Sequence, residues 1–134
     1  TGQLVADDLA FKLMAAEMAR VTRSGRDAIL DGFPRDTHQA EWVVENIGQV
    51  IKKVVRIDVP KEELVERLMA RGRTDDTKEA IEKRFEIIEQ NICSVCDILA
   101  KAGVEIVRID GTGTPDEVFR RLMEATRESD KKNE

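Results

Sequence analysis

Apolar residues recur along the chain at two spacings, which separate the segments expected to be helices from those expected to be strands. A period of three to four residues predicts five helical segments, at about 6–22, 37–49, 60–70, 77–102 and 114–126. Short apolar runs that are typical of buried strands occur at about 27–30, 54–59 and 105–110. The predicted order is helix, strand, helix, strand, two helices, strand, helix.

Strands that alternate with helices indicate a parallel sheet covered on both faces and joined by right-handed crossovers. We therefore predict a three-layer α/β/α parallel sheet, although three strands are few for this architecture. The pattern shows no internal repeat and no second domain. It predicts one core domain over 1–127, followed by a charged, frayed tail at 128–134.

Local signals place the helix ends and the inward faces. Ser24-Gly25-Arg26 is expected to end the first helix, and Asp76 with Glu79 to cap the long one. Met14 and Met18 of the first helix are expected to pack in the core. The residues of the long helix that are expected to face inward are Ile81, Phe85, Ile88, Ile92, Val95, Cys96 and Leu99.

Charge and composition narrow the classes of protein that fit. The 134 residues carry 22 Lys and Arg against 27 Asp and Glu, a net charge of -5. Such a chain does not fit a nucleic-acid coat, because that binding requires a broad basic surface. No apolar run approaches membrane-spanning length and no signal peptide opens the chain, so we expect a soluble cytoplasmic protein with no membrane partner.

The two cysteines and the single histidine do not predict a metal site. Cys93 and Cys96 form one CxxC, and His38 is distant in sequence, whereas a structural zinc ion needs four ligands. The cysteine pair lies deep inside a long helical pattern, so we expect buried or half-buried thiols. His38 is expected to be solvated, on the polar face of its helix.

The segment Ile29–Arg35, read Ile-Leu-Asp-Gly-Phe-Pro-Arg, carries the residue types of a phosphate site. An apolar run ends in Asp31, whose carboxylate suits a hydrated Mg²⁺ ion. Gly32 allows a ligand to approach the backbone, and Pro34 fixes the turn. Arg35 offers a planar fork of donors that matches phosphate oxygens. An ordinary loop with an exposed arginine is the alternative interpretation of this segment alone.

Further arginines are clustered at positions 67, 71, 73 and 84. Arg67 and Arg71 share one helical face, and a hairpin of two helices would bring all four near one point. Clustered guanidinium groups repel one another unless an anion lies between them. The alternative is a solvated charged face, neutralised by Glu66, Asp75, Asp76 and Glu82.

Several spaced motifs resemble those of the adenylate kinases, a family of nucleoside monophosphate kinases with a P-loop NTPase-like fold. The motifs are Leu30–Arg35 with Gln39-Ala40, Gly2–Val5 with Asp8-Leu9, Arg67–Asp76 with Arg84, and Ile109–Gly111. The resemblance covers nearly the whole chain. It implies transfer of a phosphoryl group from ATP to AMP, with residues 1–22 ending the AMP-binding region and 71–77 forming a minimal lid.

The resemblance also implies a role for individual residues. AMP would be bound by Gln3, Leu4, Val5, Gly32, Phe33, Pro34, Arg35, Gln39, Arg73 and Arg84. ATP would be bound by Arg67, Arg71 and Gly113. The phosphoryl group in transfer would be held by Arg35, Arg71, Arg73 and Arg84, and Mg²⁺ by Asp31 through water. The implied partners are ATP, AMP and ADP, and the complete enzyme is expected to be a monomer.

Three features depart from the family pattern. In the long helix, a Thr, Pro and Tyr pattern is replaced by Ile92, Ser94, Ile98 and Leu99. Asp36 stands where a small hydroxyl residue is usual, which places a carboxylate beside the expected phosphate site. No GxxxxGK[ST] occurs in these residues, although in the family that phosphate loop follows a central strand. We therefore expect the later part of a kinase, inactive alone, whose expected first two strands would face a gap. A UMP or CMP kinase and a non-catalytic nucleotide-binding remnant are the alternatives.

Overall fold

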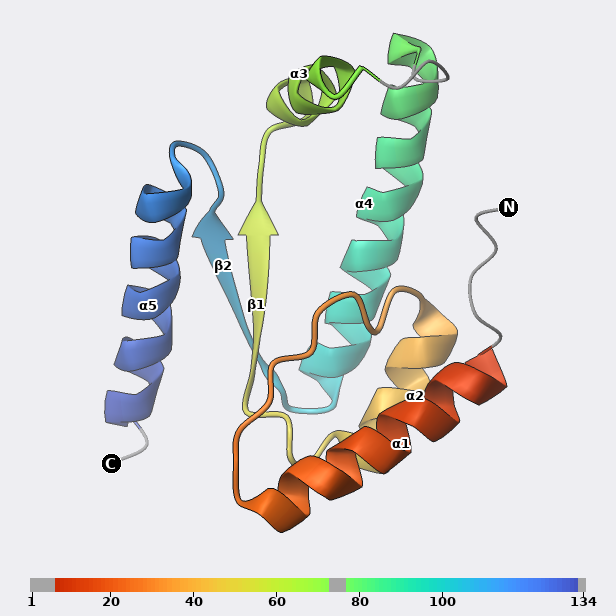
Figure 1. The fold of residues 1–134 in the computed structure, drawn as a ribbon, viewed down its shortest axis with the longest axis vertical. Coiled ribbons are helices and arrows are strands. Elements are labelled where there is room, and N and C mark those ends of the chain that lie inside the picture. The colour runs from red at the N-terminus through yellow and green to blue at the C-terminus, as the bar shows by residue number, and fades with distance from the viewer. Residues whose placement is uncertain (1–6, 73–76, 133–134) are drawn as a thin grey trace.

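Two parallel strands form the sheet of this computed structural model, which describes residues 7–72 and 77–132, with side chains to residue 127. Strand β1 (Lys53–Asp58) pairs with β2 (Glu105–Asp110) in a register that joins Lys53 to Glu105 and Asp58 to Asp110. Helices α3 (Lys61–Ala70) and α4 (Lys78–Lys101) connect the two strands (Figure 1).

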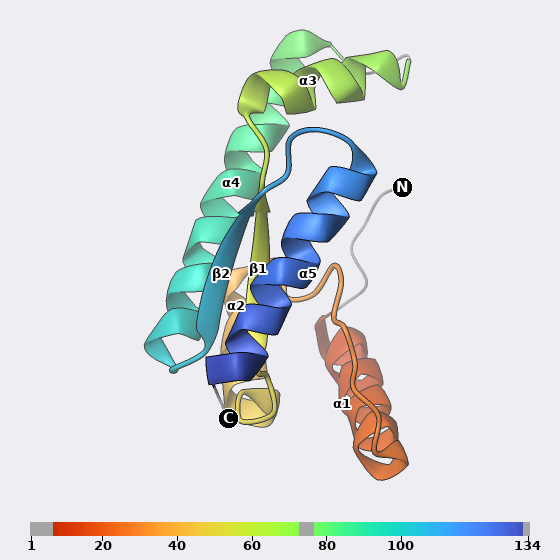
Figure 2. The same ribbon diagram turned by 90° about the vertical axis from the view of Figure 1, so that its left-hand side faces the viewer.

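Helices cover both faces of this sheet. Alternate residues of a strand point to opposite faces. Lys53 of β1 donates from Nζ to the carbonyl of Ala125 (3.3 Å) in α5 (Pro115–Lys132), whereas Arg56 pairs with Glu89 of α4. Figure 2 shows α4 and α5 on the two sides of the strands. The predicted three-layer α/β/α arrangement is confirmed.

The buried core lies between α2 (Thr37–Ile47), α4 and the chain entering β2. Its members are apolar and at most 8% exposed: Ala40, Val43, Ile47, Val95, Leu99 and Val104. Helix α1 (Asp7–Ser24) lies against this core from outside and has no buried residue of its own. Met14 and Met18 pack against the core while only partly buried, so α1 is held by few contacts.

The expected strand at 27–30 is not a strand. Residues 26–31 have no regular secondary structure and no ladder partner among the described residues, and Ile29 is 95% exposed. Within the same ranges, β1 pairs with β2 alone. A strand requires a neighbour for its N–H and C=O groups, and no described segment supplies one here. The apolar run was recognised from the sequence, but the described structure leaves it unpaired.

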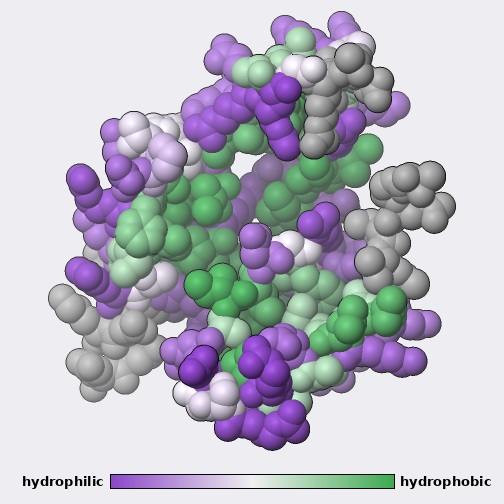
Figure 3. Space-filling view, in the orientation of Figure 1, coloured by the Kyte–Doolittle hydropathy of each residue, from purple (hydrophilic) through white to green (hydrophobic). Residues whose placement is uncertain are grey.

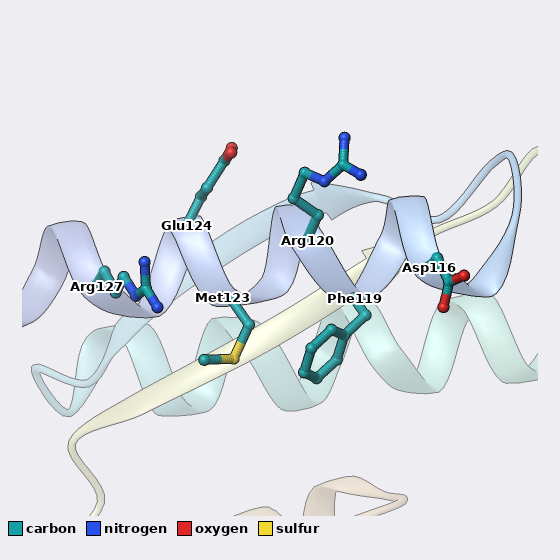
Figure 4. Close-up of a pocket in the computed structure, with 6 residues that line it drawn as sticks. All are labelled: Asp116, Phe119, Arg120, Met123, Glu124 and Arg127. Carbon is teal, nitrogen blue, oxygen red and sulfur yellow. The ribbon is translucent and has the colours of Figure 1, made fainter.

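The α5 side of β1 exposes apolar side chains. Ile57 is 52% exposed, Phe119 61% and Met123 38%. Figure 3 shows apolar groups on this face of the molecule, and Figure 4 shows Phe119 and Met123 side by side on one side of α5. The open edge of β1 and this apolar surface adjoin the same uncovered part of the sheet.

Several predicted details need correction. Thr77 caps α4, with its hydroxyl accepting from the Ala80 N–H at 3.2 Å, whereas Asp76 lies outside the described residues. Helix α5 continues to Lys132 instead of ending near residue 126. Ile88 and Ile92 are 48% and 37% exposed, because no described segment covers that part of α4.

Most of the remaining predictions for the inward face of α4 are confirmed. Ile81, Val95 and Leu99 are buried as expected, and Phe85 and Cys96 are half-buried. Burial raises the pKa of the Cys96 thiol, whereas Cys93 is exposed, contrary to prediction. No helix in 7–72 or 77–132 combines the length and the apolar character that a membrane crossing requires.

Candidate nucleotide-binding site

The loop 31–36 is fastened to the N-terminus of α2. Asp36 is the N-cap: its Oδ1 accepts a hydrogen bond from the Gln39 N–H at 2.9 Å, and its carbonyl accepts from the Ala40 N–H at 3.0 Å. A carboxylate at this position satisfies free N–H groups and complements the helix dipole. The structure thus gives Asp36, which departs from the family pattern, a local role in starting α2.

Gln39 joins this loop to α1 through its buried amide, with the residue only 6% exposed. Its Oε1 accepts from the Arg35 N–H at 2.7 Å, and its Nε2 donates to Asp7 Oδ1 at 3.1 Å. Both ends of the amide therefore have partners. One side chain fixes the backbone of Arg35 relative to two helices.

Arg35 folds back over Gly32. Its Nε donates to the Gly32 carbonyl at 2.7 Å, and Gly32 has φ of 82°. A Cβ on Gly32 would lie 3.0 Å from Arg35 Nη2, so both the backbone conformation and the close approach favour glycine. The Arg35 side chain is exposed, and its Nη atoms have no hydrogen bond to any described residue. They are available to an anion.

Aromatic rings of α1 and α2 pack against the loop 31–36. Phe33, in the cis Phe33–Pro34 peptide, packs edge-on against Trp42 at 6.1 Å and against Phe11 at 6.2 Å. Phe11 stacks on Trp42 at 4.9 Å with their planes 2° apart. The predicted residues Phe33 and Pro34 are therefore parts of a packed turn, half-buried between α1 and α2.

Asp31 is exposed in the connection between α1 and α2. The described residues contain no group of three or more metal-binding side chains. Mg²⁺ keeps several waters and is commonly bound by one or two carboxylates together with substrate phosphates. A single exposed carboxylate beside an arginine loop therefore fits the donor set that this ion requires.

The other arginines lie at the α3–α4 end of the molecule. Arg67 pairs with Glu63 in α3, Arg71 is the exposed C-cap of that helix, and Arg84 lies exposed in α4. Figure 1 shows this end well separated from the loop before α2, which holds Arg35. The structure thus holds the arginines in two groups. Their gathering around one phosphoryl group stays a prediction.

Some expected site residues fall outside the described ranges. They are Gln3, Leu4, Val5 and Arg73. Gly113 is described: it is exposed, with φ of 96°, in the loop between β2 and α5. Thr114 caps α5, its hydroxyl accepting from the Glu117 N–H at 3.2 Å.

Sequence reasoning missed the side chain that holds the loop of Gly113. Arg121 Nη1 donates to the carbonyls of Asp110 at 2.9 Å and Thr112 at 2.6 Å. Thr112 also donates from its hydroxyl and backbone to Asp110 Oδ1, and these bonds lower the pKa of Asp110. The sequence signal is weak, because Arg121 is one of several arginines in a polar helix.

A second missed network lies across the sheet. Asp58 accepts from Arg108 Nε and Arg56 Nε, both at 2.7 Å, and Arg56 also pairs with Glu89 of α4. The Arg108 and Arg56 hydrogen bonds lower the pKa of Asp58. The signal was present, since both strands read Val-Arg-Ile-Asp and pair in register. Its role is to stabilise the sheet, because these groups satisfy one another.

The chain has two parallel strands between helical layers and an Asp-Gly-Phe-Pro-Arg loop at the start of a helix. This fold and loop place it in the class of nucleoside monophosphate kinase-like α/β proteins. The family model for adenylate kinase matches residues 1–104. The adenylate kinase of Micrococcus luteus is 37% identical over 131 residues, which cover 92% of this chain and 63% of the relative.

Two further relatives agree with this match. The adenylate kinase of Thermus thermophilus is 37% identical over 92% of this chain and 67% of its own length, and that of Stenotrophomonas maltophilia is 35% identical over 92% and 69%. The chain belongs to the adenylate kinase family. It spans about two thirds of the length of these relatives, 63% for the first.

Proposed function

We propose that these residues form the AMP-binding part and much of the phosphoryl-binding part of an ATP:AMP phosphotransferase. The reaction is reversible and converts ATP and AMP into two ADP. The observation that carries the proposal is Arg35, whose backbone and Nε are held by Gln39 and Gly32 while its Nη atoms are left for an anion. Membership of the adenylate kinase family supports it.

The chemistry needs no protein nucleophile. Phosphoryl transfer is catalysed by positioning the reactants and by stabilising charge on the transferring group. In this proposal, the loop Gly32–Arg35 binds the phosphate of AMP, and Gln39 contacts its adenine. Gln3, Leu4 and Val5 complete the AMP site. An arginine fork that is held in place before substrate arrives loses little freedom on binding.

The second group of arginines acts on the phosphoryl group and on ATP. Arg71, Arg73 and Arg84 would neutralise the charge that develops in transfer, with Arg73 and Arg84 also reaching AMP. Arg67 would lie against the ATP base, and the backbone of Gly113 would line the same pocket. For both groups of arginines to contact one phosphoryl group, the α3–α4 end must approach the loop 31–35 when nucleotides bind.

Magnesium is proposed to bind together with ATP. Asp31 would hold the ion through water, and the bound ion would neutralise phosphate charge. Small nucleotides are the only partners that we propose, with no nucleic acid or membrane among them. A monomeric state and a cytoplasmic location stay predictions from the sequence.

An acceptor assay on the whole gene product tests the function. We expect ATP-dependent formation of a nucleoside diphosphate with AMP as the preferred acceptor, because an amide such as that of Gln39 can pair with adenine through one donor and one acceptor. UMP and CMP, assayed alongside, are expected to react much more slowly. Preference for a pyrimidine acceptor would assign the protein to the UMP or CMP kinases, and no turnover with any acceptor would favour a non-catalytic remnant.

A further inference from the structure

A single carboxylate connects the buried amide of Gln39 to an exposed imidazole. Asp7, in the first turn of α1, accepts from Gln39 Nε2 through Oδ1, and its Oδ2 lies 2.7 Å from His38 Nδ1. The two contacts cross 32 and 31 positions of the sequence, so they join α1 to α2. His38 also meets the Phe11 ring edge-on at 5.4 Å.

We infer that Asp7 and His38 are positioning residues for Gln39, and that protonation of His38 tightens the binding of the AMP base. The inference rests on the proposed function, because it takes Gln39 as the residue that contacts adenine. It adds two residues that neither touch the nucleotide nor belong to the predicted site. It also makes AMP binding depend on the charge of one histidine.

The partners of Gln39 fix the orientation of its amide. An ionised carboxylate only accepts hydrogen bonds, and a backbone N–H only donates. Asp7 must therefore face Nε2, and the N–H of Arg35 must face Oε1. The reversed amide would place Oε1 against the Asp7 carboxylate and Nε2 against an N–H group. Without Asp7, one of these two restraints is lost and a buried donor is left unpaired.

The orientation matters for recognition of the base. With one N–H and one lone pair used inside the protein, the amide keeps one donor and one acceptor for a ligand. A fixed amide presents this pair in one order. A rotating amide would present either order, and part of the binding energy would be spent on fixing it.

Acidic groups surround His38 and govern its charge. Asp7 faces it from α1, and Asp36 and Glu41 face it from α2 and its cap. The hydrogen bond to Asp7 is the first cause that raises the pKa of His38 above the usual 6.5, and bonds from Gln39 and His38 lower the pKa of Asp7. The charged pair is therefore complete below pH 6.5 and is lost as pH rises through the raised pKa.

Substitutions at Asp7 and His38 in the whole gene product test the inference. Asp7→Ala and His38→Ala are each expected to raise KM for AMP roughly two- to tenfold, the worth of one hydrogen bond, with kcat and KM for ATP unchanged. Asp8→Ala removes the same carboxylate from the adjacent, exposed position and is expected to leave all three constants unchanged. An NMR titration of His38 should show a lower pKa in Asp7→Ala than in the parent.

The pH profile separates His38 from the substrate, because the phosphate of AMP titrates near pH 6 by itself. The ratio of KM for AMP between His38→Ala and the parent should be largest at about pH 6 and fall toward one at about pH 9. An active parent with unchanged KM values in both variants would overturn the inference alone. A parent inactive toward every acceptor would overturn the proposed function, and the inference with it.

Discussion

Replacement of Arg35 by alanine in the whole gene product should lower kcat for ADP formation by about 100- to 1000-fold, equivalent to roughly 3–4 kcal/mol. We expect a large loss of kcat because the Arg35 guanidinium is held in place before substrate binds. The Nε bond to Gly32 holds the guanidinium before substrate binds, and the Nη atoms have no partner among the described residues. A donor of this kind stabilises developing charge without reorganisation at the moment of transfer. A coupled assay of ADP formation measures the loss.

The design separates catalysis from folding. The Arg35 backbone N–H that bonds Gln39 survives in Arg35→Ala, so the loop keeps its connection to α2. Arg26→Ala is the matched control, because Arg26 is another exposed arginine of the connection between α1 and α2 and the proposal gives it no nucleotide contact. A near-normal kcat in Arg35→Ala would remove Arg35 from the phosphoryl site.

Residues 1–134 expressed alone should form no ADP above background in the same assay, whereas the whole gene product should turn over. These residues contain no GxxxxGK[ST], so they lack the backbone cradle and the lysine that hold the β- and γ-phosphates of ATP. The backbone of residues 26–31 and the free edge of β1 also have no neighbouring strand among the described residues.

Circular dichroism provides the control for this second prediction, because an unfolded chain would also be inactive. The isolated chain should show the helical content of the five described helices. A folded chain that forms ADP at a rate comparable with that of the whole gene product would show that the reaction does not depend on a phosphate loop. That outcome would contradict the mechanism proposed for this family member.

The sequence predicted the helices well because their signals are local. Apolar spacing, Gly25 after α1, Thr114 before α5 and Pro60 before α3 all lie within a turn of the ends that they mark. The expected strand at 27–30 was wrong because an apolar run becomes a strand only beside a partner, and partners are set by tertiary structure. Burial along α4 was overestimated for the same reason: periodicity shows a face, but not what covers it.

The candidate site also has features that the sequence predicts and features that it does not. The residue types of the loop 31–35 and its resemblance to a family were readable from the sequence. The hydrogen bonds that organise the loop were not, because Asp7 meets His38 and Gln39 across 31 and 32 positions. His38 was correctly expected at the surface, with its side chain 65% exposed, but its pairing with Asp7 was not predicted.

The central claim is that the loop 31–35 and Gln39 form an AMP site. Titration of AMP into the isotopically labelled whole gene product, followed by backbone and side-chain amide NMR, tests it most directly. We predict that the amide resonances of Gly32 and Arg35 and the side-chain amide of Gln39 shift together along one saturable binding curve. Saturable AMP binding that leaves these three resonances unmoved would contradict the claim.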